Sequence, residues 1–104
     1  MAIARQTVVR HLPGAAKKVE DVLDRLEAHY ATFPGYMFGF RYQPTDDAGE
    51  MGRIALWRSL ADADHAAQQT HTIALRAELN SLIHEKHIER VLEIRGKPQK
   101  LLGL

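Results

Sequence analysis

Residues 33–42 read Phe-Pro-Gly-Tyr-Met-Phe-Gly-Phe-Arg-Tyr, and this stretch decides the fold class because it joins the end of a helix to the start of a strand. Pro34 cannot continue a helix and restricts the residue before it, so we expect a helix to end here. The aromatic residues that follow favour a strand over residues 36–42. At a period of two, one face of that strand carries Tyr36, Phe38, Phe40 and Tyr42.

The residues before this stretch predict a strand and then a helix. Residues 2–11 are rich in β-forming residues, and Leu12-Pro13-Gly14 ends the strand. From Ala15 the apolar residues follow helical spacing, which predicts an amphipathic helix of about four turns with the apolar positions Val19, Val22, Leu23, Leu26 and Tyr30.

The residues after it predict a hairpin, a second helix and a last strand. The turn chemistry of residues 44–52 leads into a strand over residues 53–58, in which Arg53, Ala55 and Trp57 share one face. Ser59 suits the N-cap of a helix, with Asp62 three residues on. That helix runs to about residue 70, bends at His71-Thr72, and resumes with apolar residues at helical spacing. Residues 88–94 form the last strand.

The resulting order, βαββαβ, is a ferredoxin-like arrangement of the α+β class: an antiparallel sheet with two helices on one face. Two helices cover one face only, yet residues 36–42 and 53–58 place apolar side chains on both faces of their strands. An uncovered apolar sheet face predicts a homodimer packed sheet to sheet. We expect a single domain over residues 1–96 and a C-terminal tail, residues 97–104, that packs on the partner subunit.

Length, charge and cysteine content exclude several classes of function. The chain has 104 residues, a net charge of +1 and no cysteine. This charge argues against a nucleic-acid partner, and the lack of cysteine excludes disulfides and thiolate chemistry. No apolar run is long enough to span a membrane, and no signal peptide is recognisable, so we expect no membrane association and a cytoplasmic location.

Three segments together resemble the antibiotic biosynthesis monooxygenase-like family of dimeric α+β barrel proteins. They are Phe33-Pro34-Gly35-Tyr36, Leu56-Trp57-Arg58-Ser59, and the stretch 61–82 with its two histidines and its Leu-Arg-Ala-Glu-Leu sequence. The resemblance covers about residues 3–95. It implies a small-molecule pocket between sheet and helices, and cofactor-independent monooxygenation is one activity of this family.

The resemblance transfers to individual residues only in part. Of four polar or aromatic residues around the pocket of quinone-forming members, the Trp matches Trp57 and the Arg matches Arg76, whereas the Asn and Tyr positions fall on Arg53 and Ala63. The axial histidine of haem-degrading members falls on Arg76, and arginine does not ligate haem iron. The paired histidines of isomerase-like members resemble His65 and His71.

These residues define the candidate site. Trp57, Arg76, His65 and His71 are the candidate catalytic residues, and Arg53, Tyr36, Phe38 and Phe40 are the candidate substrate-binding residues. Arg53 either faces the pocket or, as the favoured interpretation, sits solvated at the mouth of its strand. We expect no organic cofactor. We also expect no metal, because His84 and His87 lie three residues apart, whereas the zinc motif needs four.

Three functions stay open on the sequence alone. The first is a cofactor-independent monooxygenase acting on an aromatic or enolisable substrate. The second is an isomerase or lyase of a small hydroxy-keto metabolite that uses His65 and His71 for proton transfer. The third is a non-catalytic, ligand-binding or stress-related dimer.

Overall fold

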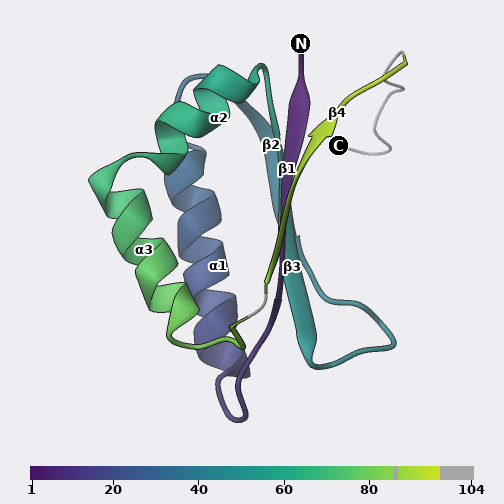
Figure 1. Cartoon of the computed structure of the whole chain (residues 1–104), viewed down its shortest axis with the longest axis vertical. Coiled ribbons are helices and arrows are strands. Elements are labelled where there is room, and N and C mark those ends of the chain that lie inside the picture. Colours follow the sequence, from purple (N-terminus) through teal and green to yellow (C-terminus); the bar gives the residue numbers. More distant parts are fainter. Residues whose placement is uncertain (86, 97–104) are drawn as a thin grey trace.

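Four strands form one antiparallel sheet, in which the first and third strands along the chain lie at the centre. The computed structural model describes residues 1–85 and 87–96. Three helices lie on one side of the sheet (Figure 1). The elements in chain order are β1 (Ile3–Arg10), α1 (Ala16–Tyr30), β2 (Tyr36–Tyr42), β3 (Glu50–Trp57), α2 (Leu60–Ala67), α3 (Thr70–Asn80) and β4 (Ile88–Glu93). The strands lie side by side in the order β2-β3-β1-β4. The predicted α+β, ferredoxin-like class is confirmed, and the predicted tail lies outside the described residues.

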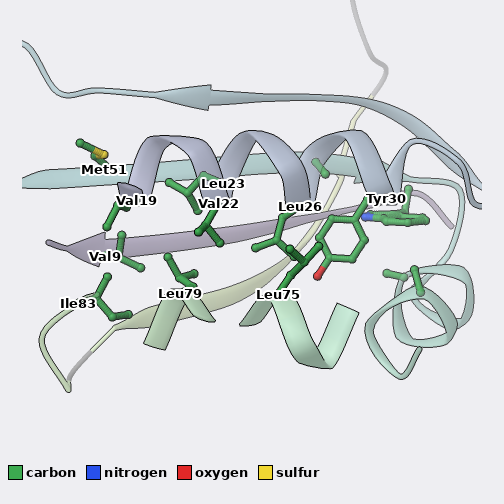
Figure 2. Close-up of a cluster of buried hydrophobic side chains, with 14 of the residues drawn as sticks. Val9, Val19, Val22, Leu23, Leu26, Tyr30, Met51, Leu75, Leu79 and Ile83 are labelled. Atoms are coloured by element: carbon green, nitrogen blue, oxygen red, sulfur yellow. The ribbon is translucent and has the colours of Figure 1, made fainter. Parts of the chain in front are cut away.

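The core forms where α1 packs between the sheet and α3. The apolar positions that the sequence placed on one face of this helix are all buried. Figure 2 shows Val9 of β1, Val19 of α1 and Leu79 of α3 gathered on the same side of the sheet with Ile83. Burial of this contiguous apolar surface is the main force that holds helices and sheet together.

A β-bulge in β2 corrects the predicted facing of its aromatic residues. Tyr36 pairs with Trp57, but Phe38 pairs with Leu56, so the register shifts by one residue at Met37. An extra residue in one strand reverses the alternation on either side of it. Tyr36 therefore faces the helices, whereas Phe38 and Phe40 lie on the opposite face of the sheet, and the prediction that they share a face with Tyr36 is wrong.

The second predicted helix is two helices, and the interruption lies earlier than expected. Ser59 caps α2 as predicted, its hydroxyl accepting a hydrogen bond from the backbone of Asp62 at 3.1 Å. The helix stops at Ala67, and Gln69 adopts an extended conformation before α3 starts. The buried Thr72 hydroxyl donates to the carbonyl of Ala66 at 2.7 Å, which ties the two helices together across the break. The break therefore precedes His71-Thr72, and both residues lie in the first turn of α3.

The strand predicted to begin at Arg53 begins at Glu50, because the β2–β3 loop is closed by hydrogen bonds that the composition of the loop does not reveal. The Gln43 side chain donates to the carbonyls of Asp47 and Glu50 at 2.7 and 2.8 Å. Glu50 thus already pairs with Arg10 of β1. Within the described residues, no helix has the length and apolar character needed to cross a membrane.

Candidate functional site

A narrow pocket lies between the helix-facing side of the sheet and helices α1, α2 and α3. Its volume is about 10 Å³, which is room for about one water molecule. The lining comes from six elements and comprises Arg5, Gln6, Thr7, Tyr30, Arg53, Trp57, Ala63, Ala67, Arg76 and Glu89. Three candidate residues from the sequence, Trp57, Arg53 and Arg76, thus border one space.

The deep wall of the pocket is aromatic. Trp57 is 2% exposed, at the carboxyl end of β3. Its ring meets the edges of Tyr30 and Tyr36 in T-shaped contacts, with centroids 5.9 and 5.4 Å apart. Edge-to-face packing of this kind holds an aromatic ring in one orientation. Trp57 is therefore both a core residue and a rigid wall of the pocket.

Arg53 lies inside the protein, and the favoured expectation that it is solvated is wrong. It is 3% exposed because its strand neighbours Ala55 and Met51 face the helices and α1 covers it. Its Nε donates to Glu27 Oε1 of α1 at 2.9 Å. Its guanidinium carbon lies 4.6 Å from the centre of the Tyr30 ring, within reach of a cation–π interaction.

Glu27 connects Arg53 to Tyr36. Its second carboxylate oxygen accepts a hydrogen bond of 2.5 Å from the Tyr36 hydroxyl. Burial, and then this bond to a carboxylate, raise the pKa of Tyr36 well above its ordinary value, so the phenol stays protonated and donates. A side chain at Gly39 would collide with both the Glu27 carboxylate and the Tyr36 hydroxyl, so the network needs glycine there.

Charged side chains from four elements surround the mouth of the pocket. Arg76 of α3 forms an ion pair with Glu89 of β4, and both side chains are about a quarter to a third exposed. Arg5 of β1 donates to Asp64 of α2 at 3.1 Å. The Thr7 hydroxyl donates to Glu89 at 3.4 Å, a long bond. The pocket therefore has a rigid aromatic wall and one buried guanidinium group, that of Arg53, at depth, and a charged and partly solvated rim.

The candidate histidines lie elsewhere. His65 and His71 are exposed on α2 and α3 and are not among the residues that line the pocket. The His71 ring instead meets His29 of α1, with centroids 4.5 Å apart, and the His65 ring meets Phe33 at 6.1 Å.

His29, which precedes the buried Tyr30 on α1, is half-buried. Its Nε2 lies 2.9 Å from the hydroxyl of Thr72. That hydroxyl already donates its hydrogen to Ala66, so Nε2 is the donor and carries the proton of the neutral ring. Burial, and then the neighbouring His71, lower the pKa of His29.

Two of the candidate binding residues face away from the pocket. Phe38 and Phe40 lie on the sheet face opposite the helices because of the bulge in β2. Tyr36, the third aromatic residue of that group, reaches the pocket only through its contact with Trp57. The structure therefore brings together Trp57, Arg53 and Arg76, with Tyr36 behind them.

Four residues of the site did not stand out in the sequence: Arg5, Thr7, Glu27 and Glu89. Helical spacing does indicate the position of Glu27. It follows Leu23 by four residues and precedes Tyr30 by three, so it lies beside the apolar stripe of its helix. Thr7 and Glu89 depend on strand register, which pairs Thr7 with Arg53 on one side and with Glu89 on the other. Periodicity within one strand carries no information about that pairing.

Residues 1–85 and 87–96 contain no group of three or more histidine or acidic side chains that could hold a metal ion. The polar chemistry of the pocket comes instead from guanidinium groups, one carboxylate and hydroxyls. Such a set suits an anionic or strongly polarised oxygen.

Solved structures that resemble this fold include a cofactor-independent oxygenase and an antibiotic biosynthesis monooxygenase. No family model matches the chain, and no curated protein matches it. SnoaB, a cofactor-independent oxygenase from Streptomyces nogalater, superimposes with a TM-score of 0.83 at 18% identity, over 95% of this chain and 98% of that one. Rv0793 from Mycobacterium tuberculosis gives 0.86 at 19% identity, over 95% and 100% of the two chains. A structure named as an antibiotic biosynthesis monooxygenase gives 0.80 at 15% identity, over 90% and 99%. The chain therefore has the fold of the antibiotic biosynthesis monooxygenase-like structures.

Proposed function

We propose that this protein is a homodimer that binds a small molecule between sheet and helices and acts on it as a cofactor-independent monooxygenase. The substrate is aromatic or enolisable. The observation that supports the proposal most is that Trp57, Arg53 and Arg76 all line one pocket. An apolar wall beside two guanidinium groups suits a flat molecule that bears an oxygen anion. The fold shared with a cofactor-independent oxygenase supports the same activity.

The chemistry needs anion stabilisation above all. Two nearby guanidinium groups lower the pKa of a bound phenol or enol, so that the substrate ionises and its proton passes to solvent. The electron-rich anion then reduces dioxygen directly. A substrate methylene becomes a carbonyl that keeps one oxygen atom, and the second oxygen atom leaves as water. Arg53 and Arg76 hold the negative charge on the substrate oxygen, and Trp57 positions the ring.

The second subunit covers the face of the sheet that the helices leave open. Figure 1 shows the described helices on one side of the sheet only. On the other side, Phe40 of β2 is 44% exposed beside the half-buried Phe38 and Ile54, and Ile88 and Leu92 of β4, at the opposite edge of the sheet, are 48% and 39% exposed. Apolar patches of this kind mark protein–protein interfaces, and the same face on a second copy provides a matching surface around a two-fold axis.

The test is oxygen consumption with an anthrone as substrate, without added flavin or metal. We expect the wild-type protein to consume oxygen and form the quinone, and the Trp57→Phe/Arg76→Ala variant to lose at least about 100-fold in rate, as for loss of an anion-stabilising donor. Arg58→Ala removes an exposed arginine next to Trp57 and serves as the matched control. Unchanged turnover in the double variant would rule out these roles.

Two further measurements separate the other two functions. Turnover of a hydroxy-keto compound that continues without oxygen and is lost in His71→Ala would favour an isomerase or lyase. A ligand that is retained through purification and released unaltered from every variant would favour a non-catalytic binding protein.

A further inference from the structure

One nitrogen of Arg53 is buried without a hydrogen-bond partner. Within residues 1–85 and 87–96, the Nη2 of Arg53 is the buried side-chain nitrogen or oxygen atom that lacks one. The Nε of the same guanidinium is bound to Glu27, and its flat face lies against Tyr30. Arg53 also lines the pocket. Buried polar groups are nearly always hydrogen-bonded, so we expect this nitrogen to donate to an acceptor atom that enters the pocket from solvent.

The carboxylates that balance the three arginines of the pocket differ in position. Glu27 pairs with Arg53, and Asp64 pairs with Arg5, but neither carboxylate lines the pocket. The third carboxylate, Glu89, pairs with Arg76 and is itself a lining residue. If the Glu89 side chain turns away, three guanidinium groups face two carboxylates, and the site keeps one positive charge. A ligand with a single negative charge restores the balance.

Glu89 is also placed to move. It lies on β4, an edge strand whose residues are all exposed, and its side chain is 32% exposed. Besides Arg76, its hydrogen-bond partner among the described residues is Thr7, at 3.4 Å. The present volume of about 10 Å³ does not admit an aromatic ring. Release of the Arg76–Glu89 pair frees a guanidinium and opens the rim in one step.

We propose that, in the unliganded protein, the Glu89 carboxylate occupies the position that the anionic oxygen of a ligand takes on binding. The ligand is a monoanion: a carboxylate or phenolate on an apolar ring. Its oxygen binds Arg53 Nη2 and Arg76, its ring rests on Trp57, and Glu89 turns out to solvent. This deepens the proposed function, on which it rests for the choice of site, because it names the charge of the ligand and the side chain that competes with it.

The experiment is calorimetric titration with benzoate, compared with its neutral isostere benzamide. Quenching of the fluorescence of Trp57, the chain's single tryptophan, reports binding at the pocket. We expect Glu89→Gln to bind benzoate roughly tenfold or more tightly than the wild type, with no gain for benzamide. Glu93→Gln is the matched control, because Glu93 lies on the same strand and the same face but pairs with Arg95 outside the pocket lining.

Arg53 is tested in a background that keeps the interior balanced. Arg53→Met/Glu27→Gln removes both charges of the buried pair together, and loss of benzoate binding in this folded variant supports the proposal. Equal affinity of Glu89→Gln and wild type, equal binding of benzamide and benzoate, or no binding by any variant would overturn it; the last outcome leaves water as the partner of Arg53. Binding needs no oxygen, so a protein that binds benzoate as expected but oxidises no anthrone refutes the proposed function and leaves this inference standing.

Discussion

The guanidinium group of Arg53 on β3 is enclosed by Glu27 and Tyr30, two residues that lie three positions apart on α1. One face of a single helix thus supplies both the counter-charge and the aromatic ring for a buried cation. Charges are costly to bury unless paired, so these contacts decide whether the centre of the sheet is stable.

The buried ion pair predicts a large effect of Glu27→Gln. The substitution keeps the shape of the side chain but leaves the Arg53 charge uncompensated, and we expect the free energy of unfolding to fall by about 3 kcal/mol. Urea denaturation measures this. Asp21→Asn on the same helix removes one of the two carboxylate partners of the exposed Arg25 and should cost far less. Similar losses in the two variants would contradict the buried-pair interpretation.

The lowered pKa of His29 predicts that stability falls in acid. The unfolded chain binds a proton at the ordinary histidine pKa of about 6.5, whereas the folded protein binds it only at lower pH. The contribution is therefore fully present above about pH 6.5 and is lost as the pH falls through the lower folded pKa.

Urea midpoints measured between about pH 8 and pH 5 test this expectation. His29→Gln should show a shallower decline than the wild type. His71→Gln should reduce the decline less, because burial is the larger cause of the shift and His71 the smaller. The exposed His84 provides the control His84→Gln. Identical pH profiles for wild type and His29→Gln would show that other groups cause the acid sensitivity.

The two hydrogen bonds of Thr72 predict that Thr72→Val is destabilising although it preserves shape. Valine removes the hydroxyl partner of both His29 Nε2 and the Ala66 carbonyl, which keeps a long backbone hydrogen bond of 3.4 Å from Gln69, and we expect a loss of about 1–3 kcal/mol in the free energy of unfolding. Thr72→Ser keeps the hydroxyl and should recover most of it. Thr70→Val, at the exposed start of α3, is the control. A neutral Thr72→Val would mean that the break between α2 and α3 is held by packing alone.

The open sheet face predicts a dimer that a single charge disrupts. Phe40→Lys places an ammonium group in the proposed interface, and we expect a shift from dimer to monomer in analytical ultracentrifugation. Ile73→Lys charges an apolar residue of similar exposure on α3, away from this face, and should remain dimeric. A monomeric wild-type protein, or a dimer that both variants retain, would refute the sheet-to-sheet arrangement.

Prediction from the sequence succeeded where one residue type or one period decides the structure. Pro34 and the aromatic run place β2 at the residues the structure assigns, and Ser59 caps α2 as its side-chain chemistry requires. It failed where an outcome depends on contacts between distant segments. The facing of Tyr36 follows from a bulge against β3, and the burial of Arg53 follows from Glu27, 26 residues away. Neither contact leaves a trace in local periodicity.

The bulge at Met37 divides β2 between two independent surfaces. Tyr36 faces the helices, whereas residues 38, 40 and 42 lie on the open face of the sheet. None of these side chains therefore contributes to both surfaces. Substitutions that reshape the outer face can therefore accumulate while the hydrogen bond between Tyr36 and Glu27 stays intact. Deleting Met37 would keep this separation, because Tyr36 and Phe38 would then be adjacent residues in regular alternation, still opposite Trp57 and Leu56, and the Tyr36 hydroxyl would still reach Glu27.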